Sequence, residues 1–259
     1  MATLYTLLHL SLKSEMAYAG SFIWYALFSF INYIFMFIFI SSIFLFTDDI
    51  AGWTEDEMKY IFYTSVLVGL LTQAFAASIF DFFKLVSQGK IEPYLVMPIK
   101  RLQLLFFRWS ELSTFLSIAL VIVLFVFYTV HFTKAELYLD VLHTAGYVTG
   151  VLVAVLVNMF FIASLSCLTF LTQREVPVDY IHEDIYRLAI LPASLFPNNS
   201  LIPILVVIPV VISASAPATI LVKGDFELFY FLILAMLTSA TFFKITYSKL
   251  TQNFDLLGG

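Results

Sequence analysis

The sequence predicts an all-α integral membrane protein, and three observations support this fold class. Hydrophobic residues make up 61% of the 259 positions. Charged residues make up only 12%, about half of their share in an average soluble domain. Long stretches also run without a single Asp, Glu, Lys or Arg, and about 20 apolar residues in a helix suffice to cross a bilayer.

Six uncharged stretches predict six transmembrane helices. Five of them have 19 residues or more, and the last has 16. They are residues 22–46, 60–80, 112–130, 145–172, 201–222 and 228–243. Six crossings use about 120–140 residues. We therefore expect one transmembrane domain over residues 1–259, with no separate soluble domain.

Lys and Arg residues are distributed unevenly over the two predicted sides. With connections assigned to alternate sides, ten of the 13 lie on one side and three on the other. The smaller set consists of Lys59, Lys134 and Lys223. Because cytoplasmic loops carry the excess of basic residues, both termini are expected in the cytoplasm.

The first 20 residues mix polar and apolar types. Leu4, Leu7, Leu8, Leu12 and Met16 fall near helical spacing. This spacing predicts an amphipathic helix that lies on the inner membrane surface. The alternative is an irregular cytoplasmic start.

Residues 81–101 form the longest basic connection and join the second and third predicted spans. Gly89 and Pro93 interrupt it, and both residue types favour turns. A long connection between packed spans is often functional, and its mixture of basic and apolar residues suits a docking surface. Contact of its Lys residues with lipid head groups is the alternative reading.

Two topologies are open for residues 174–222. In the first, residues 201–222 are the fifth span. In the second, residues 178–198 cross the membrane as an amphipathic helix, and Asp179, Glu183 and Arg187, spaced four residues apart, share one face that lines a cavity or a subunit interface. Residues 201–222 would then be a re-entrant hairpin on the outer side, broken by Pro203, Pro209 and Pro217.

The polar residues give little support for catalysis. His182, Glu183 and Asp184 are neighbours that point to different helix faces, so we expect no metal site. There is no G-x-x-x-x-G-K-[ST] loop for ATP, and the basic residues lie next to predicted spans, which argues against nucleic-acid binding.

Several short motifs together resemble the six-span permeases of the ABC-2 exporter superfamily. Gly52-Trp53-Thr54-x-x-Glu57 opens the second span, and Ser87-Gln-Gly-Lys-Ile-Glu-Pro-Tyr-Leu-x-x-Pro98 fills the inner connection. Pro192-x-x-Leu-Phe-Pro197, Ile208-Pro209 and Ala216-Pro217-Ala218 follow in the last third. The resemblance covers nearly the whole chain and is greatest to the branch that includes viologen-exporter-type permeases.

The resemblance implies a dimer of permeases, with a second copy or a paralogue, and a separate pair of ATPase subunits that bind ATP and Mg²⁺. This chain would bind no cofactor itself. The inner connection would be the coupling helix that docks in the ATPase. Its residues here are Phe83, Lys84, Gln88, Gly89, Lys90, Ile91, Glu92, Pro93, Tyr94 and Leu95. The resemblance also favours the re-entrant hairpin before the last span and begins it at Pro197, so that it covers residues 197–222.

The sequence thus leads to the hypothesis of a bacterial membrane permease for ATP-driven efflux of an amphiphilic cargo, such as a drug. The first, second and fifth spans would line the path, with Asp179, Glu183 and Arg187 on it. An ion-coupled secondary transporter is the main alternative, and it would need buried acidic or His residues. An intramembrane enzyme lacks a paired catalytic motif, and a membrane scaffold is the remaining class.

Overall fold

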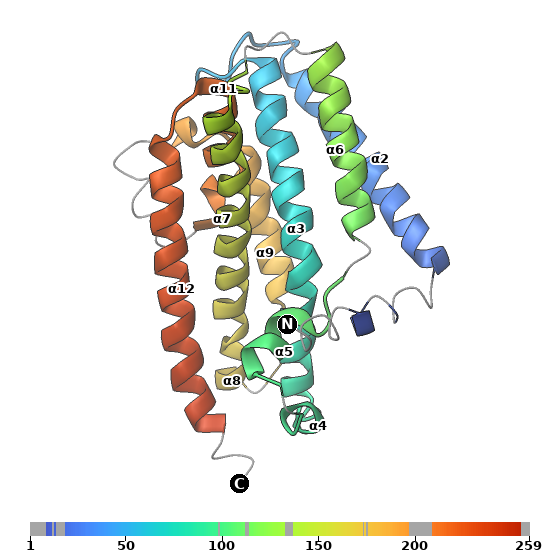
Figure 1. Ribbon diagram of the computed structural model, residues 1–259, viewed down its shortest axis with the longest axis vertical. Helices are drawn as coiled ribbons and strands as arrows, with labels where there is room; N and C mark the ends of the chain where they lie inside the picture. The colour runs from blue at the N-terminus through green and yellow to red at the C-terminus, as the bar shows by residue number, and fades with distance from the viewer. Residues whose placement is uncertain are drawn as a thin grey trace.

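The computed structural model describes residues 9–11, 13, 19–97, 99–111, 114–132, 137–172, 174, 176–196 and 209–254. Within these ranges the regular elements are helices. The helix α3 (Glu55–Ser87) stands in the centre of the bundle (Figure 1). α2 (Ala19–Ile43) and α6 (Thr114–His131) lie on one side of it, and α7 (Val141–Ser166), α11 (Ser215–Lys223) and α12 (Glu227–Phe254) lie on the other.

Four helical stretches in the described part are long and apolar enough to cross a membrane. They are Glu55–Ser87, Thr114–His131, Val141–Thr172 and Glu227–Lys249. The third includes the short helix α8 (Leu168–Thr172). Helices long and apolar enough to cross a membrane are thereby confirmed for four of the six predicted spans. Shorter apolar stretches, Tyr33–Ile43 and Pro209–Lys223, lie in α2 and around α11. The count of six crossings stays a prediction.

The start of α3 is fixed by its own sequence. The backbone N–H of Thr54 donates to the Glu57 carboxylate at 2.8 Å, which is half of the capping box that the spacing Thr-x-x-Glu favours. Glu55, Asp56 and Glu57 occupy the first turn, where negative charge interacts favourably with the helix dipole. The whole helix has 33 residues and is about 50 Å long.

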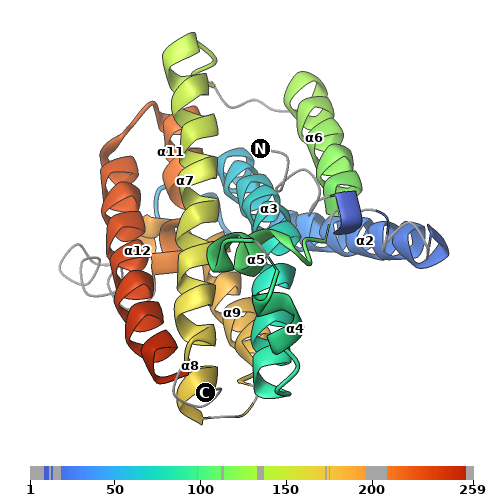
Figure 2. The same cartoon turned by 60° about the horizontal axis from the view of Figure 1, so that its bottom comes forward.

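The inner connection is more helical than the expected loop over residues 81–101. α3 continues to Ser87, because the residues after Asp81 keep an apolar face that packs on the bundle. The short helices α4 (Glu92–Leu95) and α5 (Arg101–Phe107) follow. Figure 2 shows these two helices beside the C-terminal end of α3.

Residues 178–196 run from one end of the bundle to the other. They form α9 (Val178–Tyr186), then the 3₁₀ turns η1 (Arg187–Ile190) and η2 (Ala193–Leu195). Val178 packs with Phe83 near the end of α3, whereas the Ser194 hydroxyl donates to the Ala51 carbonyl before the start of α3, at 2.9 Å. The continuous helix expected over 178–198 is therefore replaced by a helix and two tighter turns.

The segment after η2 returns to the same end of the molecule. Its described part consists of η3 (Pro209–Ile212) and α11, whose side chains from Pro209 to Val222 are buried. Lys223 at the end of α11 donates to the Gly52 carbonyl at 2.9 Å. Departure near Ala51 and return near Gly52 are compatible with a hairpin, and Pro209 and Pro217 lie inside the bundle. Pro197 and Pro203 lie outside the described residues.

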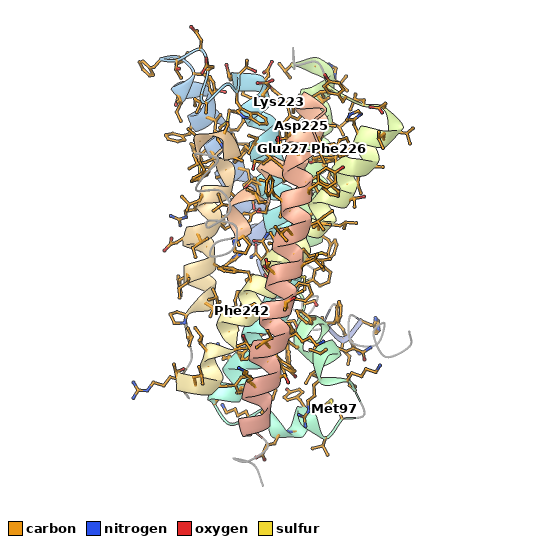
Figure 3. The ribbon with its side chains drawn as sticks, turned by 90° about the vertical axis from the view of Figure 1, so that its left-hand side faces the viewer. Met97, Lys223, Asp225, Phe226, Glu227 and Phe242 are labelled. Carbon is orange, nitrogen blue, oxygen red and sulfur yellow. The ribbon has the colours of Figure 1, made fainter. Side chains whose placement is uncertain are left out.

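The two ends of the bundle differ in their basic residues. Lys59 and Lys223 lie at the end where α3 begins, and Lys84, Lys90, Lys100 and Arg101 lie at the end where α3 stops. Figure 3 shows Met97 and Lys223 at these opposite ends. Of the expected interfacial helix over residues 1–20, only 9–11, 13, 19 and 20 are described. In that part the Ser11 hydroxyl donates to the Arg108 carbonyl at 2.7 Å.

Candidate functional site

A glycine turn ends α3 and starts the inner connection. Gly89 has a positive φ of 66°, which glycine adopts at no steric cost. The N–H of Lys90 donates to the Leu85 carbonyl at 2.8 Å, and the N–H of Gly89 donates to the Val86 carbonyl at 3.0 Å. These two bonds form the Schellman motif that often closes helices. Gly89 therefore sets the direction in which α4 leaves α3.

The root of the connection is packed into the bundle. Ile91 and Phe83 are buried in one cluster with Leu105 of α5. The rings of Phe83 and Phe170 meet edge to face with centroids 5.4 Å apart. The Tyr94 ring packs against Trp109 at 5.1 Å. Because side chains from three helices hold this root, α4 is attached to the bundle rather than to a free loop.

The tip of the connection is exposed and apolar. The Val96 side chain is 83% exposed, and Met97 is also exposed. Met97 lies at the lower edge of the molecule in Figure 3. The docking segment predicted from the sequence ended at Leu95 and did not include these two residues. An apolar pair within a basic connection is the signal that could have revealed them, since exposed apolar patches often mark interaction sites.

The ten residues expected to dock on a partner divide into two groups. Phe83 and Ile91 are buried, and Tyr94 is half-buried. The exposed group consists of Lys84, Gln88, Gly89, Lys90, Glu92 and Pro93. The backbone of Leu95 belongs to α4, but its side chain lies outside the described residues. The structure thus separates residues that anchor the connection from residues that a partner can reach.

The charged residues of α9 and η1 form an exposed face. The Arg187 guanidinium contacts the Glu183 carboxylate at 3.2 Å and the Asp184 carboxylate at 3.9 Å. Asp179 is not part of this group. It lines a cavity of about 210 Å³ together with Asp81 and Lys84 of α3. The structure therefore brings Glu183 and Arg187 together and places Asp179 beside the inner end of α3.

His182 points into the bundle, unlike its charged neighbours. Its Nε2 lies 3.0 Å from Oδ1 of Asn158 in α7. The Asn158 amide nitrogen donates to the Ala154 carbonyl at 2.8 Å, so its oxygen is left to accept a hydrogen bond from Nε2–H. Next to it, the Tyr186 hydroxyl donates to the Ser65 carbonyl at 2.5 Å. In the described part of the chain no three His, Cys, Asp or Glu residues form a metal site.

Residues 30–253 match a model of the ABC-2 family transporter protein. The chain belongs to this family. It is therefore an ABC-type permease and a multi-pass membrane protein. Permeases of the family are membrane components that generally partner with ABC ATPase subunits and normally lack an ATPase site. Comparisons with curated proteins and with solved structures gave no significant match.

In this ABC-2 permease, the inner connection and α9 share one buried cluster. Ile91 of the connection, Phe83 of α3 and Val178 of α9 belong to it. Protein interiors are close-packed and transmit strain. A displacement of α4 would therefore shift the start of α9. This helix carries His182 and, together with η1, the charged face.

Proposed function

We propose that this permease is the membrane subunit of an ATP-driven exporter and that its inner connection docks on a separate ATPase subunit. The observation that carries this proposal is the shape of the connection. Val96 and Met97 are exposed at its tip, while Phe83 and Ile91 fix its root in the bundle. An exposed apolar tip on a packed root can bind in a cleft of a partner, whereas contact of its apolar side chains with water is unfavourable.

Coupling would proceed through packed side chains. ATP binding draws the two ATPase subunits together, and the movement reaches α4. The cluster of Ile91, Phe83 and Val178 passes it on to α9. Two alternative packings of the helices, one open inward and one open outward, are sufficient for transport.

The exposed charges on α9 support a second subunit. A charged side chain at membrane depth is costly unless it faces protein or water. Glu183, Asp184 and Arg187 are exposed in the single chain, on a segment that runs between the two ends of the bundle. We propose that a second copy, or a paralogue, covers this face and that the transport path runs between the two subunits, lined by α2, α3 and α9.

The cargo is proposed to be amphiphilic and to leave the cytoplasm of a bacterium. The membrane helices offer mainly apolar surface to a substrate, which suits a molecule that enters from the inner leaflet. The orientation follows from the positive-inside rule, since Lys84, Lys90, Lys100 and Arg101 share the end that holds the ATPase-docking tip. The segment 197–222 would form the outer re-entrant hairpin.

The docking surface is tested by Val96→Asp, with Val141→Asp as the matched control. Val96 and Val141 are 83% and 87% exposed, but Val96 follows α4, whereas Val141 begins α7, and α4 and the start of α7 lie at opposite ends of the bundle in Figure 1. A buried charge at an interface centre typically costs 2 kcal/mol or more, so we expect about 30-fold weaker binding of the ATPase. Affinity purification of each tagged variant from the native membrane measures the recovered ATPase. Equal recovery of the ATPase with Val96→Asp and Val141→Asp would contradict the docking proposal.

An ion-coupled transporter remains the second candidate because His182 is a half-buried ionisable residue that faces Asn158 inside the bundle. His182→Gln separates the two functions. Gln preserves a donor to Asn158 but cannot carry a proton. The ATP-driven mechanism predicts efflux from cells that is unchanged by this substitution and insensitive to an uncoupler. Loss of efflux in His182→Gln, together with loss in the uncoupled wild type, would favour ion coupling instead.

A further inference from the structure

A cavity of about 420 Å³ lies between α2, α3 and α6. Its volume is within the range of small-molecule sites in proteins. It is separate from the inner connection and from the charged face of α9, because no residue of α4 or α9 lines it. The proposed transport path shares α2 and α3 with this cavity, but its third wall is α9, whereas the third wall of the cavity is α6.

The charged groups that line the cavity lie at one end, called here the polar end, and the rings of Tyr33 and Tyr63 also contribute to the lining. Asp56 and Lys59 in the first turns of α3 and Tyr128 near the end of α6 line the polar end. Val66 and Val121 line the other end, and Val66 is about 15 Å along the helix from Asp56. A long apolar space with polar groups at one end has the polarity of a single-chain amphiphile.

The charges at the polar end favour a cationic head group. The Lys59 ammonium contacts the Glu55 carboxylate at 2.5 Å and lies 4.9 Å from the Phe37 ring centroid. The Tyr128 hydroxyl donates to the Asp56 carboxylate. Two carboxylates, Glu55 and Asp56, and one ammonium thus occur in the first turns of α3 at this end, and a carboxylate can accept more than one hydrogen bond. The excess of negative charge attracts an ammonium.

The cavity opens towards lipid. Ile34, Phe127 and Phe132 line it and are also among the exposed apolar side chains of α2 and α6. α2 itself is sparsely packed, since Ile40 is the one fully buried side chain among those described for this helix. A flexible chain entering from the bilayer would fill the gap between α2 and the α3–α6 pair.

We propose that this cavity binds one acyl chain of an ammonium-bearing membrane lipid, of the phosphatidylethanolamine type, with the head group at Asp56. The bound chain completes the packing of α2 against α3 and α6. Asp56 lies at the end of α3 opposite the inner connection, so the lipid would belong to the outer leaflet. This leaflet assignment rests on the orientation in the proposed function, whereas the binding itself does not.

The test uses the full chain in phospholipid vesicles that contain traces of phosphatidylethanolamine with a photoreactive diazirine on one acyl chain. After irradiation, mass spectrometry maps the adducts. We expect them to concentrate on the cavity-facing residues of α3 and α6, among them Phe62 and Leu124. Leu124→Trp fills the cavity and should lower labelling of α3 about tenfold. Val123→Trp, one residue away and 65% exposed, should leave the labelling unchanged.

Three results would overturn the proposal. One is wild-type labelling spread evenly over the exposed faces of α2 and α6, which decides the matter even if Leu124→Trp does not fold. Another is unchanged labelling in a folded, monodisperse Leu124→Trp. The last is stronger labelling by the phosphatidylglycerol analogue with the same diazirine chain. Labelling needs no ATPase, so its failure leaves the export function untouched, and loss of ATPase binding would leave the labelling intact.

Discussion

At the scale of single residues, two glycines fix parts of the bundle for different reasons. Gly89 adopts a left-handed conformation with open space around it. Gly69 lies in the middle of α3, where an added Cβ would come within 3.0 Å of the Tyr186 ring. Its missing side chain allows Tyr186 to reach the Ser65 carbonyl. Gly89 is thus needed for its backbone, and Gly69 for close approach.

The backbone role of Gly89 is tested by Gly89→Ala. An L-residue in the left-handed region costs about 1–2 kcal/mol, so we expect a corresponding loss of stability and weaker ATPase binding as α4 changes direction. Gly20→Ala is the control, because Gly20 also has no neighbour within 4 Å of a built Cβ but lies in a helix. Thermal unfolding in detergent measures both. A Gly89→Ala protein as stable as Gly20→Ala would contradict the argument.

The packing role of Gly69 gives a second expectation. In Gly69→Ala the new methyl group meets the Tyr186 ring, and overpacking of a core typically costs about 1–3 kcal/mol. The melting temperature should fall relative to Gly20→Ala. Adding Tyr186→Phe should not restore it, since the ring remains, whereas Tyr186→Ala should recover part of the loss. Full stability in Gly69→Ala would show that the ring can move aside.

At the scale of elements, three segments far apart in the sequence meet at the end where α3 begins. The Trp53 Nε1–H donates to Ser194 of η2 at 3.2 Å, and the Lys223 ammonium at the end of α11 lies 4.1 Å from the Trp53 ring centroid. Trp53 thus joins the α2–α3 connection, η2 and α11. This junction holds both ends of the proposed hairpin.

A double-mutant cycle on Trp53 and Ser194 measures this junction. Trp53→Phe and Ser194→Ala each remove one partner of the same hydrogen bond. Trp53→Phe should cost about 1 kcal/mol of unfolding free energy, and Ser194→Ala should cost more because its hydroxyl also donates to the Ala51 carbonyl. The double variant should cost less than the sum, because contacting residues are not additive. Trp53→Phe combined with Ser42→Ala, whose hydroxyl bonds only within α2, is expected to be additive. Strict additivity of Trp53 and Ser194 would refute the contact.

At the scale of the whole molecule, the absence of charge was enough to predict the long helices. The runs 60–80, 145–172 and 228–243 each lie within a helical stretch long enough to cross a membrane, and the run 112–130 coincides with such a stretch from Thr114 onwards. Gly89 also marked the turn correctly, since glycine is the residue that the left-handed conformation requires. These features depend on local sequence, which explains why they could be read without a structure.

Features that depend on distant contacts could not be read in the same way. His182 was grouped with Glu183 and Asp184, but its partner Asn158 is 24 residues away. Val96 and Met97 look like ordinary apolar residues until their exposure is known. Lys59 was counted only among the three basic residues of the less basic side, whereas in the structure Phe37 and Tyr128 from two other helices enclose it. The six-span count, the hairpin and the docking residues stay predictions.

The central claim is that the inner connection touches an ABC ATPase in the cell. A photoreactive amino acid in place of Gln88, which is exposed at the end of α3, tests it most directly. Irradiation of intact cells followed by mass spectrometry should give an adduct with an ABC ATPase. The same probe at Asp225, at the opposite end of the bundle, should give none. An ATPase adduct from Asp225 but not from Gln88, or no ATPase adduct at either position, would contradict the account.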